Sequence, residues 1–145
     1  MKDFTIYIAT SWKNQHAVEL LTDYLETYFV NVEVKSFVRN ANEEPLKATV
    51  IEDITAWIWS ERGKSSFDYD TYWAGNSNLI IAISPLGKDS SVEIGIAYNN
   101  KKPVVLLYSK GEDLGLMRRC FSEVFNDYKL LISYLTENYP VAKRN

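Results

Sequence analysis

The sequence predicts a single α/β domain built on a small, mostly parallel sheet. Two continuous apolar runs of strand length, Leu79–Ser84 and Pro103–Tyr108, are typical of strands covered on both faces. A β-branched and aromatic run, Phe4–Ala9, predicts a third strand near the start of the chain. Helical patterns separate these runs, and strands that alternate with helices form right-handed βαβ units. A chain of 145 residues can bury a proper core, so we expect residues 1–145 to form one domain.

The first half of the chain predicts a strand, a helix and a second strand. After Phe4–Ala9, the pair Thr10-Ser11 offers a helix cap, and 14–29 carries apolar residues at helical spacing. The alternation of Val32, Val34 and Phe37 predicts the second strand. The segments that follow predict a polar loop at 40–45, a helix within 46–59 despite its many β-formers, a loop at 62–66 and a short helix at 67–74.

The second half predicts two more strands with a helix between them. Leu79–Ser84 is followed by a turn at 85–89 and a short helix at 90–99, after which Pro103–Tyr108 forms the next strand. Residues 113–137 predict one long helix or two shorter ones, with Glu112 and Asp113 as its cap.

These elements predict a three-layer, flavodoxin- or Rossmann-like fold with four to five strands in the approximate order 2-1-3-4. The order reverses between the first and third strands, and ligands of such sheets bind beyond the carboxyl ends of the strands at that point. The segments to inspect for a site are therefore 7–13, 84–93 and 108–112.

Composition and charge exclude several classes of protein. The net charge is −3 and no long Lys or Arg run is present, so we expect no nucleic-acid partner. One cysteine and one histidine exclude an intrachain disulfide, a cysteine-based zinc cluster and a multi-histidine metal site. No apolar stretch reaches membrane-spanning length, and the start of the chain is too short and polar for a signal peptide. We therefore expect a cytoplasmic protein with no membrane association, no metal and no cofactor.

The most informative segment runs from Ser84 to Ala97. A buried strand ends in a turn that contains Gly87, and the next helix opens with Glu93 near its start. Amides at a helix start favour anions, either a bound phosphate or an ionised carboxylate, and a carboxylate held ionised beside a cleft is what a covalent nucleophile requires. The same residues also form a Ser-x-x-Glu capping box from Ser90, in which the glutamate only returns to the cap amide. Spacing by itself favours the capping box.

Several blocks resemble the nucleoside 2-deoxyribosyltransferase-like family, including small members with N-glycosidase character. The opening Ile6–Asn14 is similar to the family's first strand and loop. Pro85–Gly87, the Glu-Ile-Gly-Ile-Ala block at 93–97 and Lys101–Val104 resemble its Pro-x-Gly, Glu-Leu-Gly-x-Ala and Gly-Lys-Pro signature. The resemblance covers most of the chain and is weakest over 38–66.

The resemblance implies an activity and three catalytic residues. In this family the glutamate of the Glu-x-Gly block attacks the anomeric carbon of a nucleoside and forms a glycosyl-enzyme ester; the matching residue is Glu93. Tyr7, at the end of the first strand, occupies the position that orients this carboxylate. Asp70 matches the aspartate that contacts the base and helps it to leave, a task for which Asp89 is a second candidate.

The resemblance also implies binding residues and an oligomer. The predicted substrate-binding residues are Ser11, Trp12, Gly87, Asp89 and Ser90, although Ser11 serves equally well as a helix cap and Trp12 as a core residue. Lys88 and Asp89 stand where relatives favour small or hydroxyl residues, which puts phosphate binding by this loop in doubt. Relatives complete their pockets from a neighbouring subunit, so we expect a homodimer or larger, with the helices from Phe67 and Ser90 near the contact.

Three functions remain open at this stage. The first is cleavage or transfer of an N-glycosidic bond on a nucleoside or nucleotide, where hydrolysis and transfer differ only in whether water or a second base resolves the intermediate. The second is a TIR-like NAD glycohydrolase, which shares the sheet and a glutamate near an apolar strand. The third is a nucleotide-binding or signalling module without turnover.

Overall fold

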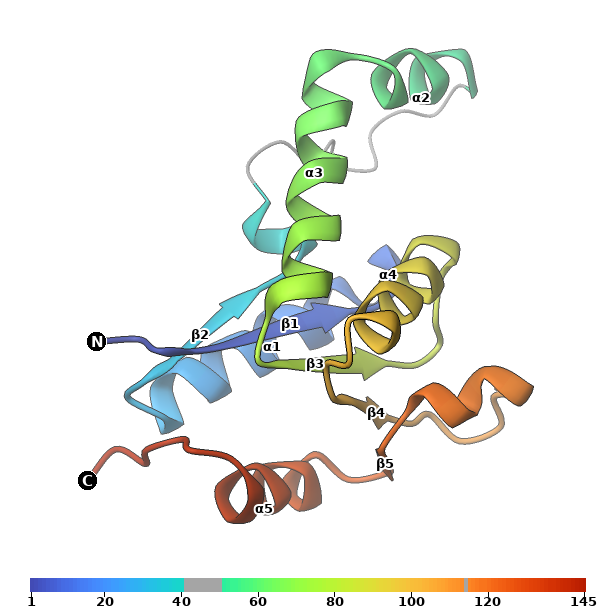
Figure 1. Cartoon of the computed structure of the whole chain (residues 1–145). Helices are drawn as coiled ribbons and strands as arrows, with labels where there is room; N and C mark the ends of the chain where they lie inside the picture. Colours follow the sequence, from blue (N-terminus) through green and yellow to red (C-terminus); the bar gives the residue numbers. More distant parts are fainter. Residues whose placement is uncertain (41–50, 114) are drawn as a thin grey trace.

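Five strands form one parallel sheet, at the centre of the view in Figure 1. The computed structural model describes residues 1–40, 51–113 and 115–145. The strands are β1 (Phe4–Ala9), β2 (Val32–Lys35), β3 (Leu79–Ile83), β4 (Val104–Leu107) and β5 (Glu123–Phe125). Their order is β2-β1-β3-β4-β5, so the predicted order of the first four strands is confirmed and the fifth lies at the β4 edge.

Helices cover both faces of the sheet, as the three-layer prediction requires (Figure 1). The α-helices are α1 (Gln15–Tyr28), α2 (Ile51–Ile58), α3 (Glu61–Asn76), α4 (Lys88–Asn99) and α5 (Tyr128–Asn138). Three short 3-10 helices are η1 (Trp12–Asn14), η2 (Phe37–Arg39) and η3 (Leu116–Cys120). The α1 and α5 helices share one apolar core with the sheet, and α3 and α4 share another.

The two cores follow from the alternation of side chains along β1. Ile6 and Ile8 point into the core with α1 and α5, whereas Tyr7 and Ala9 point into the core with α3 and α4. All four side chains are buried. The Tyr7 hydroxyl is therefore buried between the sheet and the α3 and α4 helices, where it needs a hydrogen-bond partner from the protein.

The predicted loop at 62–66 is wrong, because these residues form the first turns of α3. Ser60 caps the helix, and its Oγ accepts a hydrogen bond from the Gly63 amide at 3.1 Å. The sequence shows little apolar spacing here because most side chains from Glu61 to Ser65 face solvent. A Cβ at Gly63 would overlap the Trp57 carbonyl oxygen, so glycine permits the close approach of α2 to α3. The helix predicted at 67–74 is thus the second half of a longer one.

The predicted helices over 113–137 are only partly correct. This region contains η3, the edge strand β5 and then α5, which is capped by Asp127 rather than by Glu112 and Asp113. A strand as short as Glu123–Phe125 has too few residues to show an alternation of apolar and polar side chains. It is defined by its backbone pairing with β4.

The other boundaries lie near the predictions. The first helix runs over 15–28, the predicted second strand ends before Phe37, and the uncertain segment 46–59 contains α2, with 41–50 outside the described residues. No helix in the described part of the chain is long and apolar enough to cross a membrane.

Candidate active site

A buried tyrosine–glutamate pair lies where β1 and β3 meet α4. Tyr7 and Glu93 are 86 residues apart in the chain, and the Tyr7 hydroxyl lies 3.1 Å from each oxygen of the Glu93 carboxylate, to which it donates. Only 1% of Tyr7 and 8% of Glu93 is exposed. A carboxylate that receives a hydroxyl donor in a buried setting is held in one orientation. The structure thus brings together two of the three residues that the sequence predicted as catalytic.

The start of α4 separates Glu93 from the helix cap. The helix begins at Lys88 after the N-cap residue Gly87, two residues earlier than predicted. The Ser90 Oγ, at the third helical position, accepts the Gly87 amide at 2.7 Å. Glu93 lies beyond this first turn, on the face that meets Tyr7. The capping-box alternative is therefore wrong for Glu93, because the side chain that accepts the hydrogen bond of the N-cap amide is that of Ser90.

The third predicted residue, Asp70, lies on α3 at the side of the same pair. Its Oδ1 accepts a hydrogen bond of 3.2 Å from the Asn40 Nδ2, and the same nitrogen lies 2.9 Å from the Ser66 Oγ. Asn40 is 6% exposed and Ser66 is 2% exposed, so the Asn40 side-chain amide links the residue that follows η2 to α3 inside the protein. Asp70 also acts on Tyr7, since its charge and a side-chain hydrogen bond both help to raise the tyrosine pKa.

The environment of Tyr7 keeps its hydroxyl protonated. Burial, then the Glu93 and Asp70 carboxylates, raise the pKa of Tyr7 well above its ordinary value of 10.0. The hydroxyl is thus a hydrogen-bond donor throughout the range in which most enzymes work. In that pH range the Tyr7 hydroxyl donates to Glu93 and is not ionised, so it cannot act as a base.

We expect Tyr7→Phe to destabilise the protein by about 1–3 kcal/mol, because Glu93 loses a buried donor. Above about pH 10 this difference should shrink. In the wild type the unfolded chain ionises Tyr7 there while the folded chain does not, which costs up to about 1.4 kcal/mol of folding free energy per pH unit. Urea unfolding of both proteins between pH 7 and 11 measures this. A constant difference would show that Tyr7 ionises as easily in the folded protein as in the unfolded chain.

Side chains from the segment that follows β1 hold the end of β3 and the loop 84–87 on one side. The Thr10 Oγ1 donates to the Ile83 carbonyl at 2.5 Å, and the Asn14 Nδ2 reaches both the Thr10 hydroxyl and the Pro85 carbonyl, at 2.8 and 3.0 Å. A Cβ at Gly87 would come within 3.3 Å of the Ser11 Cβ, so the loop passes close to the end of β1.

Side chains after β4 hold the same loop on the other side. The Ser109 amide donates to the Ser84 Oγ at 2.5 Å, and the Ser109 hydroxyl donates to the Ser84 carbonyl at 2.6 Å. The Glu112 Oε1 accepts the Leu86 amide at 3.1 Å. The loop that precedes α4 is therefore hydrogen-bonded to the segments that follow both neighbouring strands, β1 and β4.

The predicted binding residues lie in or next to this loop, and they differ in burial and in the contacts that they make. Ser11 caps η1 through a bond from the Lys13 amide, and Trp12 packs on Phe37 with ring centroids 4.1 Å apart. Asp89 is exposed in the first turn of α4, and Ser90 is fully buried with its hydroxyl bonded to Gly87. Among the described residues, no three His, Cys, Asp or Glu side chains gather closely enough to hold a metal ion.

Sequence reasoning missed Asn40 and Ser66, and it included Glu112 in the segment 108–112 without predicting its contact with the loop before α4. Asn40 follows the second predicted strand, and a polar residue just beyond a carboxyl strand end is a signal that could have found it. Ser66 was assigned to a loop, and Glu112 to a helix cap. Their partners are 26 or more residues away in the chain, which no local pattern reports.

The strand order and the helices on both faces of the sheet define a doubly wound α/β fold. In this chain the buried Tyr7–Glu93 pair lies beside the switch point between β1 and β3. Within this fold class, the chain resembles a 2-deoxyribosyltransferase from the psychrotolerant bacterium Bacillus psychrosaccharolyticus. The TM-score is 0.63 with 19% identity, over 97% of this chain and 99% of that one.

Two further solved structures share the fold. One is a Clostridium botulinum CMP N-glycosidase, with a TM-score of 0.55 and 17% identity over 91% of this chain and 98% of that one. The other is a conserved protein from Enterococcus faecalis, with a TM-score of 0.62 and 16% identity over 92% and 98%. No family model and no curated protein matches the sequence. The resemblance predicted from the sequence is thus confirmed at the level of the fold.

Proposed function

We propose that this protein cleaves the N-glycosidic bond of a nucleoside or nucleotide, with Glu93 as a covalent nucleophile. The observation that carries this proposal is the buried Tyr7–Glu93 pair between β1 and α4, with Asp70 beside it. Two solved proteins with the same fold, a 2-deoxyribosyltransferase and a CMP N-glycosidase, support the same reaction class.

In the proposed reaction a Glu93 oxygen attacks C1′ of the sugar. The bond from C1′ to the base nitrogen breaks, its electron pair leaves with the base, and Asp70, protonated in the substrate complex, gives its carboxyl proton to that base and becomes a carboxylate. The transition state has oxocarbenium character, which the carboxylate stabilises before it forms the ester, as in retaining glycosidases. Tyr7 keeps the carboxylate oriented. Water, or the nitrogen of a second base, then attacks C1′ and the bond from C1′ to the Glu93 oxygen breaks. The proton lost by the attacking group returns to Asp70, so hydrolysis and transfer both restore Glu93 and Asp70.

A cleavage panel tests the proposal directly. Purified protein is incubated with ribo- and deoxyribonucleosides, their 5′-monophosphates and NAD, with and without a second free base, and the released base is followed by chromatography. We expect base release from a nucleoside or nucleotide. Release from NAD only would favour the TIR-like alternative, and binding without release from any member would favour a module that does not turn over substrate.

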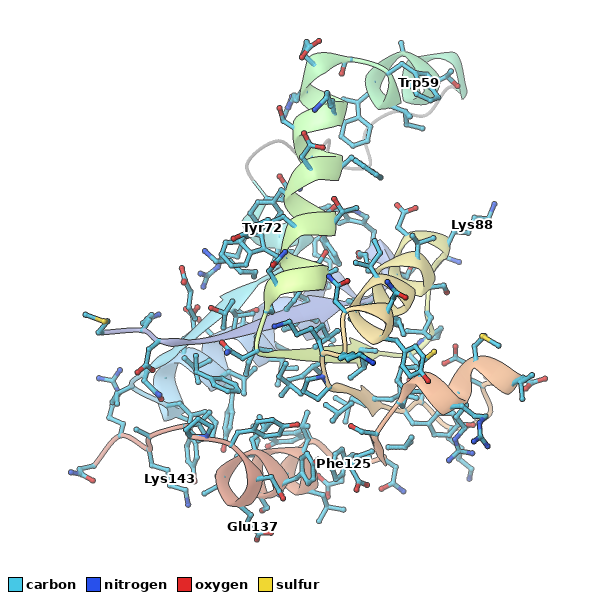
Figure 2. The ribbon with its side chains drawn as sticks, in the orientation of Figure 1. Trp59, Tyr72, Lys88, Phe125, Glu137 and Lys143 are labelled. Atoms are coloured by element: carbon cyan, nitrogen blue, oxygen red, sulfur yellow. The ribbon has the colours of Figure 1, made fainter. Side chains whose placement is uncertain are left out.

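We also propose that the protein forms a homodimer or larger assembly and works in the cytoplasm. The arm formed by α2 and the first half of α3 extends beyond the sheet (Figure 1) and exposes apolar side chains. Trp59 is 84% exposed, Phe67 64% and Ile58 48%. Figure 2 shows Trp59 at the end of this arm. Exposed aromatic side chains of this kind are typical of interfaces.

We expect light scattering at micromolar concentration to give at least twice the monomer mass of 16.7 kDa. The double variant Trp59→Lys with Phe67→Glu should shift the protein toward the monomer, because each change places a charge in an apolar contact. A matched double change on the exposed side of α5, Leu130→Lys with Ser133→Glu, also adds one charge of each sign and serves as the control. A monomeric wild type would contradict the prediction.

A further inference from the structure

A basic hollow lies at the far end of α4 from the loop that opens this helix. Its volume is about 510 Å³, and three cationic side chains line it: Lys101 and Lys102, just after α4, and Arg119, near the end of η3. Among the described residues no acidic side chain lines this hollow. It is therefore positive in a protein whose net charge is −3, and its volume suits a small organic ligand.

Backbone hydrogen bonds hold the walls of the hollow. The Lys101 amide donates to the Tyr98 carbonyl at 3.0 Å and closes the end of α4. On the other side, the Ser122 amide donates to the Val104 carbonyl at 2.8 Å and joins the segment after η3 to the start of β4. The carbonyls of 96–98 each accept a backbone amide, so the negative end of the helix is covered and does not repel an anion in the hollow.

The backbone at Lys101 favours glycine, yet a lysine stands there. Its φ is 58°, in the left-handed region that residues with a side chain rarely adopt. Glycine commonly ends a helix in this conformation, and the Gly-Lys-Pro signature that Lys101–Pro103 resembles has glycine at the first position. The lysine therefore costs folding free energy, and a strained residue at the rim of a positive hollow points to a role for its charge.

The three cations have no acidic partner in the part of the chain that the structure describes. The ion pairs there involve other side chains, and Glu123, the acidic residue nearest to Arg119 in the chain, forms none with it. Cations that line one hollow repel one another, and a dianion between them relieves this repulsion. Ammonium and guanidinium groups both bind phosphate, and a guanidinium can do so through two parallel hydrogen bonds.

Aromatic rings stand beside these charges. Tyr98, in the last turn of α4, is 58% exposed and lines the hollow. Phe121 is half-buried and packs against the core that the sheet shares with α3 and α4. An exposed ring beside cations offers a flat face on which a planar base can stack. The hollow thus combines groups that bind a phosphate with a ring that binds a base.

We infer that this hollow binds a mononucleotide, with its phosphate on the three cations and its base against the Tyr98 ring. The hollow is separate from the candidate active site. It lies at the amino end of β4, whereas the loop that opens α4 follows the carboxyl end of β3 (Figure 1). The inference is independent of the proposed function, because it requires binding and no cleavage.

Cys120 provides a local readout of binding. It is the one cysteine of the chain, and it lines the hollow in a half-buried position. Its alkylation by iodoacetamide, a neutral reagent, is followed by mass spectrometry with increasing AMP, adenosine, ribose 5-phosphate or inorganic phosphate. Glu93→Gln protein is used so that no base is released during the measurement. We expect AMP to slow alkylation with a midpoint below about 1 mM, and the other three to need at least about 10-fold more.

Three single changes locate the binding. Lys101→Gly removes one charge and suits the left-handed backbone, so it should raise the AMP midpoint about 10-fold in a protein that is at least as stable to heat. Arg119→Gln should raise the midpoint by a similar factor. Lys129→Gln, on the exposed side of α5, is the matched control and should leave it unchanged. Added salt should weaken AMP binding to the wild-type hollow, because it screens the cations.

The outcomes decide the inference without touching the proposed function. Alkylation that AMP does not slow overturns it, and so does protection that neither Lys101→Gly nor Arg119→Gln reduces. Equal protection by ribose 5-phosphate, phosphate or adenosine overturns the assignment to a mononucleotide. A short single-stranded oligonucleotide that protects Cys120 more strongly than AMP would place the hollow in a nucleic-acid surface and also overturns it. Base release by the wild type is measured separately in the cleavage panel.

Discussion

Replacing Glu93 by Gln should reduce turnover by about 10⁴-fold or more, because an amide is a poor nucleophile and forms no stable glycosyl ester. The change keeps the size of the side chain, and its amide oxygen can still accept the Tyr7 hydroxyl that now lies 3.1 Å from the carboxylate. The fold should therefore survive, which circular dichroism and thermal unfolding can verify. Initial rates of base release measure the loss.

The control for this change is Glu137→Gln, an exposed glutamate on α5 that Figure 2 shows far from α4. It should alter neither rate nor stability measurably. A nucleophile also has a chemical signature. Glu93→Ala with a substrate that carries a good leaving group should regain part of its rate when azide is added, and the product should be a glycosyl azide of inverted configuration. A fully active Glu93→Gln protein would remove Glu93 from the mechanism.

Replacing Asp70 by Asn should slow base release by roughly 10²–10⁴-fold, the usual contribution of a general acid. The side-chain oxygen of an asparagine can still accept the hydrogen bond from the Asn40 Nδ2, which now measures 3.2 Å, so the contact between Asn40 and α3 remains. The loss should be smaller for substrates whose leaving group departs easily, such as a nitrophenyl deoxyriboside. Equal losses on good and poor leaving groups would show that Asp70 only positions the base.

The same helix offers a matched control two residues earlier. Asp68 is exposed and pairs with Lys64 at 2.6 Å, one helical turn away. Water screens an exposed pair of this kind, so Asp68→Asn should leave both activity and stability nearly unchanged. A loss of rate in Asp68→Asn as large as that in Asp70→Asn would indicate a general effect of charge on α3 instead of proton transfer.

The sequence by itself determined the parallel sheet and the order of its first four strands, and its resemblance to a known family pointed to the Tyr7–Glu93 pair. Buried strands such as Leu79–Ile83 are read easily, because covered strands need continuous apolar runs. The position of Tyr7 follows from alternation along β1, which sends every second side chain to the α3 and α4 face. The resemblance of the Glu-Ile-Gly block then selected Glu93 from among the carboxylates of the chain.

Only the tertiary structure decided the edge strand β5, the first half of α3 and the residues that hold the site in place. The strand β5 exists through pairing with β4, and α3 begins among solvent-facing residues that carry no apolar period. The choice between a helix cap and a carboxylate bonded to Tyr7 for Glu93 also required coordinates. The helix begins at Lys88, which gives the capping bond to Ser90 and turns Glu93 toward Tyr7. The Tyr7–Glu93 bond joins residues 86 apart in the chain, whereas local sequence patterns encode only neighbours a few residues apart.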